Sequence, residues 1–228
     1  MKSILYWSVL IVSIAVIVSS CAKSDESKTA STDNTNSSSE DSSSTPTYTY
    51  ATPTSGATAS GTITLGNYSI SGTYATFCFS ASDSSAPTDA THIGFVAVVT
   101  GNDNYTLETN FYTDSTCTAD TLSLGSYSNM DNVTDQGPTA SDSTANQKVT
   151  YVLRDLGFMA KSTAADTFVT NLWSTYSLDF EVDVLKVLSS GNPYYNLIKV
   201  ADDGSLSFGE ADRSAYPSTV GSSKYVKQ

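Results

Sequence analysis

The sequence predicts a mainly β domain, an antiparallel meandering β-barrel or sandwich with one short helix, after a disordered tether. Three observations support this. Short segments rich in Thr, Tyr, Ile and Phe recur after Gly61, separated by Gly and Asn turns. Only one segment has helical periodicity, and residues 22–60 are almost all small or polar. We favour a barrel over a sandwich because closure removes exposed strand edges.

The first half of the domain contains most of the expected strands. Residues 92–100 form a continuous apolar run that is short enough for a buried strand, and the GNDN turn at 101–104 precedes its partner. Residues 129–147 are polar and predict a long loop. The expected strands lie at 61–80, 92–100, 105–113, 121–127 and 148–159.

One helix is expected after the strand at 148–159. Thr163 and Asp166 have the spacing of a capping box. The apolar residues behind them fall at i, i+1, i+4 and i+5 and share one helical face, formed by Phe168, Val169, Leu172 and Trp173.

The segment Leu178–Val184 alternates apolar residues with acids, the pattern of a half-buried strand. Phe180 is therefore expected in the core and Glu181 in water. Gly191-Asn192-Pro193 predicts a turn after this strand, and Asp202-Asp203-Gly204 predicts a hairpin between the strands at 194–200 and 205–209.

The N-terminus has the features of a secretory signal peptide. Lys2 precedes the apolar run Ile4–Val18, and small residues follow at Ser19 and Ser20. The alternative is an uncleaved membrane anchor, which needs about 20 apolar residues to cross a bilayer. The run from Ile4 to Val18 is shorter than that, so the sequence favours a signal peptide at residues 1–20.

The cleavage site, Val18-Ser19-Ser20-Cys21, resembles the lipobox of bacterial lipoproteins. The resemblance implies that Cys21 receives a diacylglycerol, that residues 1–20 are removed, and that the membrane is a partner through this lipid. Two or more acyl chains hold a protein firmly, whereas one chain anchors it marginally. In enteric lipoproteins an Asp after the cysteine retains the protein in the inner membrane. Ala22 therefore predicts a location in the cell envelope, at the outer membrane of a Gram-negative bacterium.

The composition divides the mature chain into two regions. Residues 21–60 carry the lipidated cysteine and a Ser/Thr-rich tether that cannot recover the entropy of ordering, and residues 61–228 form the β-rich domain. Tyr48 and Tyr50 are the large side chains of the tether, where the chain could first contact the domain. Removing residues 25–55 is expected to leave the thermal midpoint nearly unchanged.

The charge and the cysteines restrict the function further. A net charge of -12 argues against nucleic acid as a partner and fits a soluble acidic surface. With Cys21 lipidated, Cys78 and Cys117 remain, and an exported chain favours a disulfide between them. Such a bridge would contribute about 4 kcal/mol in the chain-entropy model. A structural zinc site needs four ligands, so two cysteines alone make a poor one.

The sequence offers no clear catalytic chemistry. The single histidine, His92, lies inside the apolar run. A base or haem ligand is one interpretation, and a hydrogen-bonded histidine in the core or barrel lining is the favoured one. The G-x-S-x-G and P-loop patterns do not occur, and Asp131–Gly137 lacks two of the residues that an EF-hand loop requires. We therefore predict no enzyme, no catalytic residue, no cofactor and no metal site.

The domain has a second resemblance. Gly72–Cys78, "GTYATFC", resembles the G-x-W opening of lipocalin-like domains, with Tyr74 in place of Trp. Tyr112–Cys117, Leu124–Tyr127 and the tail Leu206–Tyr225 are similar to segments of uncharacterised bacterial lipoproteins. The resemblance implies a lipocalin-like barrel and brings no activity with it.

Two functions remain open for this domain. The first is a binding module for a small apolar ligand, a glycan or an envelope protein. The second is a structural or surface-display lipoprotein, adhesin-like, with no small-molecule site. An apolar cavity of about 300 Å³ or more would favour the first, and a filled barrel the second.

Overall fold

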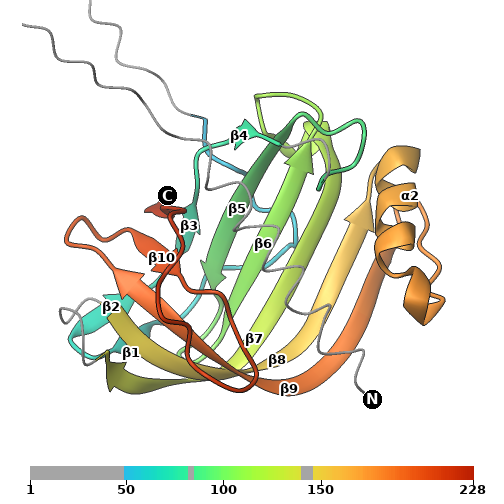
Figure 1. Ribbon diagram of the computed structural model, residues 1–228. Coiled ribbons are helices and arrows are strands. Elements are labelled where there is room, and N and C mark those ends of the chain that lie inside the picture. The colour runs from blue at the N-terminus through green and yellow to red at the C-terminus, as the bar shows by residue number, and fades with distance from the viewer. Residues whose placement is uncertain (1–48, 82–84, 140–145) are drawn as a thin grey trace, which may run out of the picture.

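The computed structural model describes residues 49–81, 85–139 and 146–228 (Figure 1). The signal peptide, the lipobox with Cys21 and the tether up to residue 48 lie outside these described residues.

The main sheet is an antiparallel meander in which neighbouring strands follow one another along the chain. The order continues with β10 (Leu206–Phe208), which extends the sheet from the last long strand. Hydrogen bonds between successive strands pair the backbone N–H and C=O groups, and no long crossover connection is needed between these strands. The long strands are β5 (His92–Val99), β6 (Tyr105–Tyr112), β7 (Leu122–Pro138), β8 (Asn146–Ala160) and β9 (Leu185–Val200).

Short strands bring the two sides of this sheet together. β3 (Thr73–Ala75) and β4 (Phe79–Ser80) pair with β5, and β11 (Val226–Lys227) pairs with β3. Next to β11, Tyr225 forms a bridge to Leu206 of β10. The sheet therefore becomes a nearly closed antiparallel barrel, which confirms the predicted fold class. β1 (Ile63–Leu65) and β2 (Tyr68–Ile70) form a separate hairpin.

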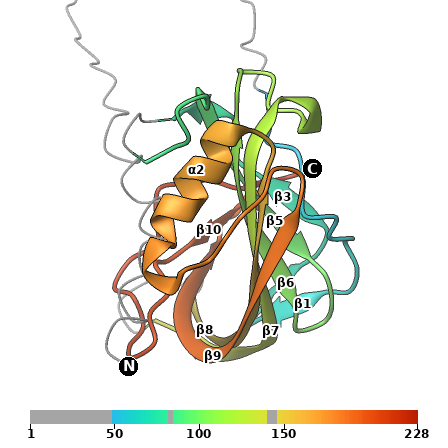
Figure 2. The ribbon, with the colours of Figure 1, turned by 90° about the vertical axis from the view of Figure 1, so that its right-hand side faces the viewer.

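The predicted helix is present as α2 (Thr163–Leu172). Its N-cap is Ser162, one residue before the expected start, and the Ser162 side chain accepts a hydrogen bond of 3.0 Å from the amide of Ala165. Ala165 and Val169 are fully buried, and the helix contacts the ends of β7 and β8 (Figure 2). The described residues also contain two 3₁₀ turns, η2 (Ala119–Thr121) and η3 (Ser174–Tyr176).

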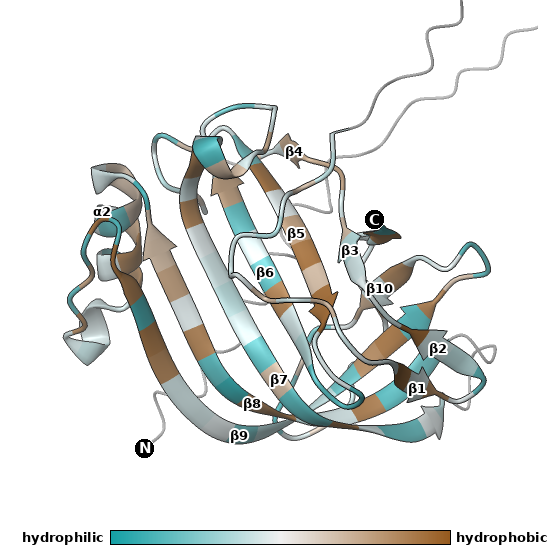
Figure 3. Cartoon of the chain, turned by 180° about the vertical axis from the view of Figure 1, so that it is seen from behind, coloured by the Kyte–Doolittle hydropathy of each residue, from teal (hydrophilic) through white to brown (hydrophobic). Residues whose placement is uncertain are grey.

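β5 is buried on both faces, as its continuous apolar sequence predicts. Ile93, Phe95, Ala97 and Val99 point into the barrel core. Val96 and Val98 point outward, and a segment at residues 49–60, here called the strap, covers this outer face (Figure 3). Tyr50 bridges to Phe77, and Ala51 packs so closely that a side chain on Gly94 would overlap it.

The strap corrects the expected domain boundary. Tyr50, Ala51 and Ala57 pack on the domain and the Ser60 amide bonds to Val99 of β5, so the domain begins before residue 61, and residues 50–55 contribute contacts that the tether was expected to lack. Apart from Tyr50, their side chains are small, and sequence composition therefore assigns them to the tether. Tyr50 and Ala51 make apolar contacts, and the other contacts come from backbone groups and hydroxyls.

Glu108 holds the strap in place. Its carboxylate is 2% exposed and accepts hydrogen bonds from the Thr54 amide at 2.7 Å, the Ser55 amide at 3.2 Å and both hydroxyls. Asn110 donates a further bond of 3.0 Å. Burial raises the pKa of Tyr112 to about 12, so its hydroxyl stays protonated and donates to the Thr52 carbonyl. Satisfied bonds of this kind allow a carboxylate to be buried.

Two predicted interruptions are strands in the structure. The loop expected at 129–147 is wrong in its described part, because β7 continues to Pro138 and β8 begins at Asn146. The turn expected at residues 191–193 is a bulge inside β9, where Gly191 has a φ of 76° and pairing with β8 continues on both sides. Pro193 is tolerated because β10 pairs with β9 only at residues 198–200.

The strand predicted at Leu178–Val184 is also wrong. Ser177 and Asp183 have positive φ values of 53° and 63°, which break an extended chain, and only Val182 forms a bridge, to Ala160. Val184 is 47% exposed instead of facing the core. The separate predictions for Phe180 and Glu181 are nevertheless confirmed, because Phe180 is 5% exposed and Glu181 lies in solvent.

We expect Phe180→Ala to lower the free energy of unfolding by about 3–5 kcal/mol. Its ring meets Phe158 edge-on, with centroids 5.8 Å apart, in a cluster that also contains Trp173. Glu181→Ala should change stability by no more than about 0.5 kcal/mol, because this side chain is exposed. Chemical denaturation measures both. Equal small effects would show that the segment does not pack on the barrel.

Truncation tests the strap. Removing residues 22–57 should lower the thermal midpoint by about 6–12 °C, because Glu108 loses its strap donors at a cost of about 3 kcal/mol or more. Removing residues 22–48 should leave the midpoint unchanged and serves as the control. Calorimetry of both variants decides: equal melting temperatures would mean that the strap does not contribute to stability.

Candidate functional site

The inner face of the sheet is hollowed where small side chains lie side by side. Strand register aligns Phe95, Thr109, Ser126 and Phe158 in one row across β5–β8. The next row contains Leu107, Ser128 and Leu156. The centre of both rows consists of Thr or Ser, and large apolar residues flank it. The depression therefore arises because the inward-facing side chains at the centre of these rows are small, while those at the ends of the rows are large.

A cavity of about 110 Å³ occupies this depression. The sheet forms its floor, and the C-terminal segment after β10 closes it through Gly209, Glu210 and Ala211 on one side and Gly221 and Ser223 on the other. Its lining is mainly apolar, and Asn196 and Glu210 are the larger polar residues. Glu108 and Tyr127 also border the cavity, but their side chains extend to the outer face of the sheet. The apolar and aromatic lining residues are Phe95, Leu107, Met130, Tyr151, Leu156, Phe158, Phe208 and Tyr225.

Aromatic rings make one wall of the cavity rigid. Phe208 lies 5.0 Å from Tyr225 and 5.9 Å from Tyr105 between ring centroids, and Tyr105 meets Tyr151 edge-on at 5.9 Å. Such pairs contribute about 0.5–1.5 kcal/mol beyond their buried area. Burial raises the pKa of Tyr105, Tyr151 and Tyr225 above the ordinary value. These tyrosines are therefore neutral at physiological pH, and the wall carries no charge.

The predicted disulfide is present. Cys78, between β3 and β4, is bonded to Cys117 in the loop after β6, with Cα atoms 6.3 Å apart. This separation lies within the roughly 4.4–6.8 Å range of disulfides. The bridge joins two loops at one end of the barrel, away from the cavity lining. Cys21 lies outside the described residues.

His92 does not line the core or the barrel. It is half-buried at the first position of β5, on the outer face, because the adjacent Ile93 points inward. Its Nδ1 is 2.9 Å from the Thr91 hydroxyl. The expectation of a core or barrel-lining histidine is therefore wrong, and the cause is its position at the end of the apolar run.

The acidic segments have structural partners. Asp131–Gly137 lies within β7. In this segment Asp131 pairs with Arg154, and Asp135 accepts from the amides of Gly66 and Gly137. Gly204 lies in the predicted hairpin turn between β9 and β10, with a φ of 78°. Within the described residues, no three His, Cys, Asp or Glu side chains are arranged to hold a metal ion.

Sequence patterns did not identify Glu108 or the pair Arg154 and Asp155 as important. Glu108 has the sequence context of an exposed strand residue, and only the fold shows the strap above it. The pair has one sequence signal: two consecutive charges interrupt the mainly apolar strand expected at 148–159, at the position of a β-bulge.

Comparison with protein-family models found no family that matches the chain, and a search of curated proteins found no match. In the part of the chain that the structure describes, no helix has the length and apolar character needed to span a bilayer.

Proposed function

We propose that this protein is a lipid-anchored lipoprotein of the bacterial cell envelope whose barrel binds a small apolar ligand. The observation that carries the binding proposal is the inner cavity with its apolar and aromatic lining. Sites for small molecules are typically concave and mostly apolar, with a few polar groups that orient the ligand. Asn196 and Glu210 are placed to do so here.

The volume of the cavity limits its ligand. At about 110 Å³ it is smaller than the roughly 300–1,000 Å³ of sites that bury drug-sized molecules. A single aromatic ring or the end of an aliphatic chain fits this size, and a haem or a whole lipid does not. The small volume also supports the alternative, a structural or surface-display lipoprotein with no small-molecule site.

The anchor is proposed from the sequence. The lipobox at Val18–Cys21 and the apolar run before it support cleavage after Ser20 and lipidation of Cys21. Ala22 supports transport to the outer membrane of a Gram-negative bacterium. The chain then attaches the barrel to the membrane through residues 22–48, and the strap begins at residue 49.

Filling the cavity tests the binding function. Ser128→Leu places a larger apolar side chain on the cavity floor, and it should abolish the amide shifts that benzene, indole or octanol produce in the NMR spectrum of the purified protein. Ser69→Leu is the matched control, because Ser69 is exposed on β2. If none of the three probes shifts the amide signals of the cavity residues, the display function is favoured instead. The same holds if the Ser128→Leu variant binds the probes with unchanged affinity.

The anchor has its own test. Cys21→Ser should abolish incorporation of labelled palmitate and leave an uncleaved or soluble protein, because the thiol that receives the lipid is missing. Membrane fractionation and metabolic labelling in a bacterial host measure this. A Cys21→Ser variant that still carries label and stays on the membrane would show that the lipoprotein proposal is wrong.

A further inference from the structure

The outer face of the barrel carries a second, polar groove that the cavity does not account for. It has a volume of about 340 Å³, within the roughly 300–1,000 Å³ range of small-ligand sites. The strap residues 55–57 form one wall, and the loop between β5 and β6 forms another. Its floor consists of outward-facing residues of three strands, Thr106, Tyr127, Asn129 and Arg154.

A β-bulge places two charged residues on this face of the sheet, of which Arg154 lines the groove and Asp155 lies beside it. Asn129 pairs with Asp155 and Met130 with Leu153, so Arg154 is an extra residue in β8 without a partner. Consecutive side chains of a regular strand point to opposite faces, but a bulge changes this alternation. Arg154 and Asp155 therefore lie on the same face and contact each other at 2.8 Å. Bulges occur often beside binding sites, where they redirect side chains.

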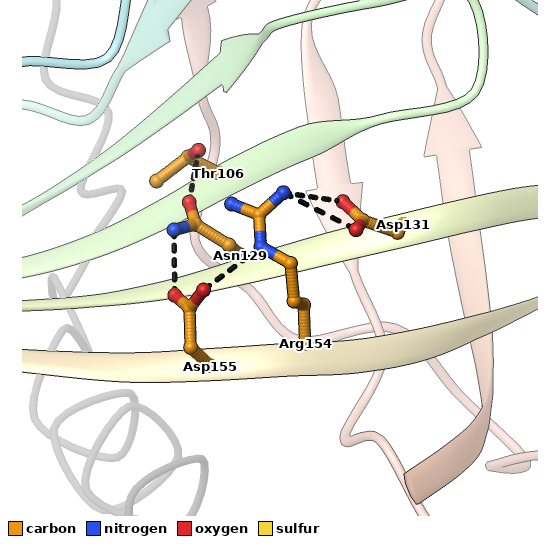
Figure 4. A network of polar contacts seen from close by, with 5 residues as sticks. All are labelled: Thr106, Asn129, Asp131, Arg154 and Asp155. Carbon is orange, nitrogen blue, oxygen red and sulfur yellow. Dashed lines mark hydrogen bonds and ion pairs between the residues drawn. The ribbon is translucent and has the colours of Figure 1, made fainter. Parts of the chain in front are cut away.

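Three floor side chains, those of Thr106, Asn129 and Arg154, form one hydrogen-bonded network with Asp131 and Asp155 (Figure 4). Thr106 donates to the amide oxygen of Asn129 at 2.6 Å, and the amide nitrogen of Asn129 donates to Asp155 at 2.7 Å. Arg154 donates through Nε to Asp155 and through Nη1 to Asp131, at 2.8 Å and 3.1 Å. These contacts fix the polar groups before any ligand arrives, which lowers the entropy cost of binding.

Tyr127 adds a flat apolar surface beside the network. Its ring lies directly against Gly157 of β8, where any larger residue would overlap the ring atoms. Burial, and secondarily the charge of Asp155, raises the pKa of Tyr127, while Arg154 lowers it. The hydroxyl is therefore neutral and close to both charged groups. The face of an aromatic ring carries partial negative charge and attracts weakly positive C–H groups.

The charge of the network selects the ligand. One guanidinium stands between two carboxylates, Asp131 and Asp155, so the local net charge is negative and anions are repelled. Arg154 Nη2 makes no hydrogen bond within the described residues and can donate to a ligand. The side-chain oxygen of Asn129 can accept from hydroxyls, and an aromatic face contacts C–H groups. A neutral polyhydroxyl molecule supplies both kinds of group.

We propose that this groove binds a neutral saccharide unit, with Tyr127 against a sugar face, with Arg154 and Asn129 bonded to its hydroxyls, and with Asp155 orienting both of these side chains. The site lies on the opposite face of the sheet from the apolar cavity, and its occupation does not depend on the cavity. The strap wall also connects it to Glu108, which fixes Ser55 at the edge of the groove.

NMR titration of the purified protein tests the proposal with glucose, galactose, mannose, N-acetylglucosamine and their disaccharides. At least one of them should shift the amides of Tyr127, Asn129 and Arg154, whereas glucuronate and inorganic phosphate should not. No shift from any neutral sugar would overturn the proposal, as would equal shifts from the two anions.

Variants locate the site. Tyr127→Ala should lower the affinity for the sugar that binds by about tenfold, and Arg154→Met should lower it to a similar extent. Tyr127→Phe keeps the ring and should retain most of the affinity, provided that its thermal midpoint matches that of the parent protein. Tyr216→Ala, in the C-terminal loop, is the matched control. Unchanged affinity in both Tyr127→Ala and Arg154→Met would place the sugar elsewhere and overturn the assignment.

Discussion

The structure depends on the burial of β5 on both of its faces. A barrel strand normally buries one face and exposes the other, yet β5 has valines on the side away from the core. Exposing this apolar surface would cost about 25 cal/mol for each Å² in contact with water. The strap removes it from water. The segment that connects the barrel to its N-terminal region is therefore also a structural layer of the domain.

The strap in turn depends on Glu108. Apart from Tyr50, its residues are too small to be held by apolar burial alone, so hydrogen bonds fix their position. A buried carboxylate is acceptable here because backbone amides and hydroxyls surround it. The same contacts place Ser55 and its neighbours at the edge of the outer groove. A substitution at Glu108 would thus affect the covering of β5 and the shape of the groove together.

Much of the fold is encoded in local sequence patterns, and the errors have physical causes. β5, β6 and α2 follow from apolar runs and helical periodicity, which report burial directly. The end of β7 is mostly polar and has Met130 and Val133 as its core residues, so pairing with β8, rather than an apolar pattern, defines it as a strand. Leu178–Val184 has perfect alternation, but left-handed residues at positions 177 and 183 break the chain there.

The candidate sites were harder to predict, because each is built from residues far apart in the sequence. The cavity requires the register of four strands, and the outer groove requires a bulge and the strap. Aromatic and serine residues are common in any β protein, so composition alone could not separate lining residues from ordinary strand residues. The adjacent charges of Arg154 and Asp155 are a local sequence signal of the bulge, but they were not among the features used to predict the fold.

One tetrapeptide of β7 contributes to both sites. Ser126 and Ser128 point inward and form the floor of the apolar cavity, while Tyr127 and Asn129 point outward into the polar groove. Side chains alternate with a period of two, so a slip of one residue in the pairing of β7 would exchange the two sets. Tyr127 would then fill the cavity, and serines would replace the aromatic floor of the groove. The pairing of Thr106 with Asn129 and of Asn129 with Asp155 opposes this slip, because polar groups matched across three strands would lose their partners. The network on the outer face therefore also fixes the register that keeps the inner cavity open.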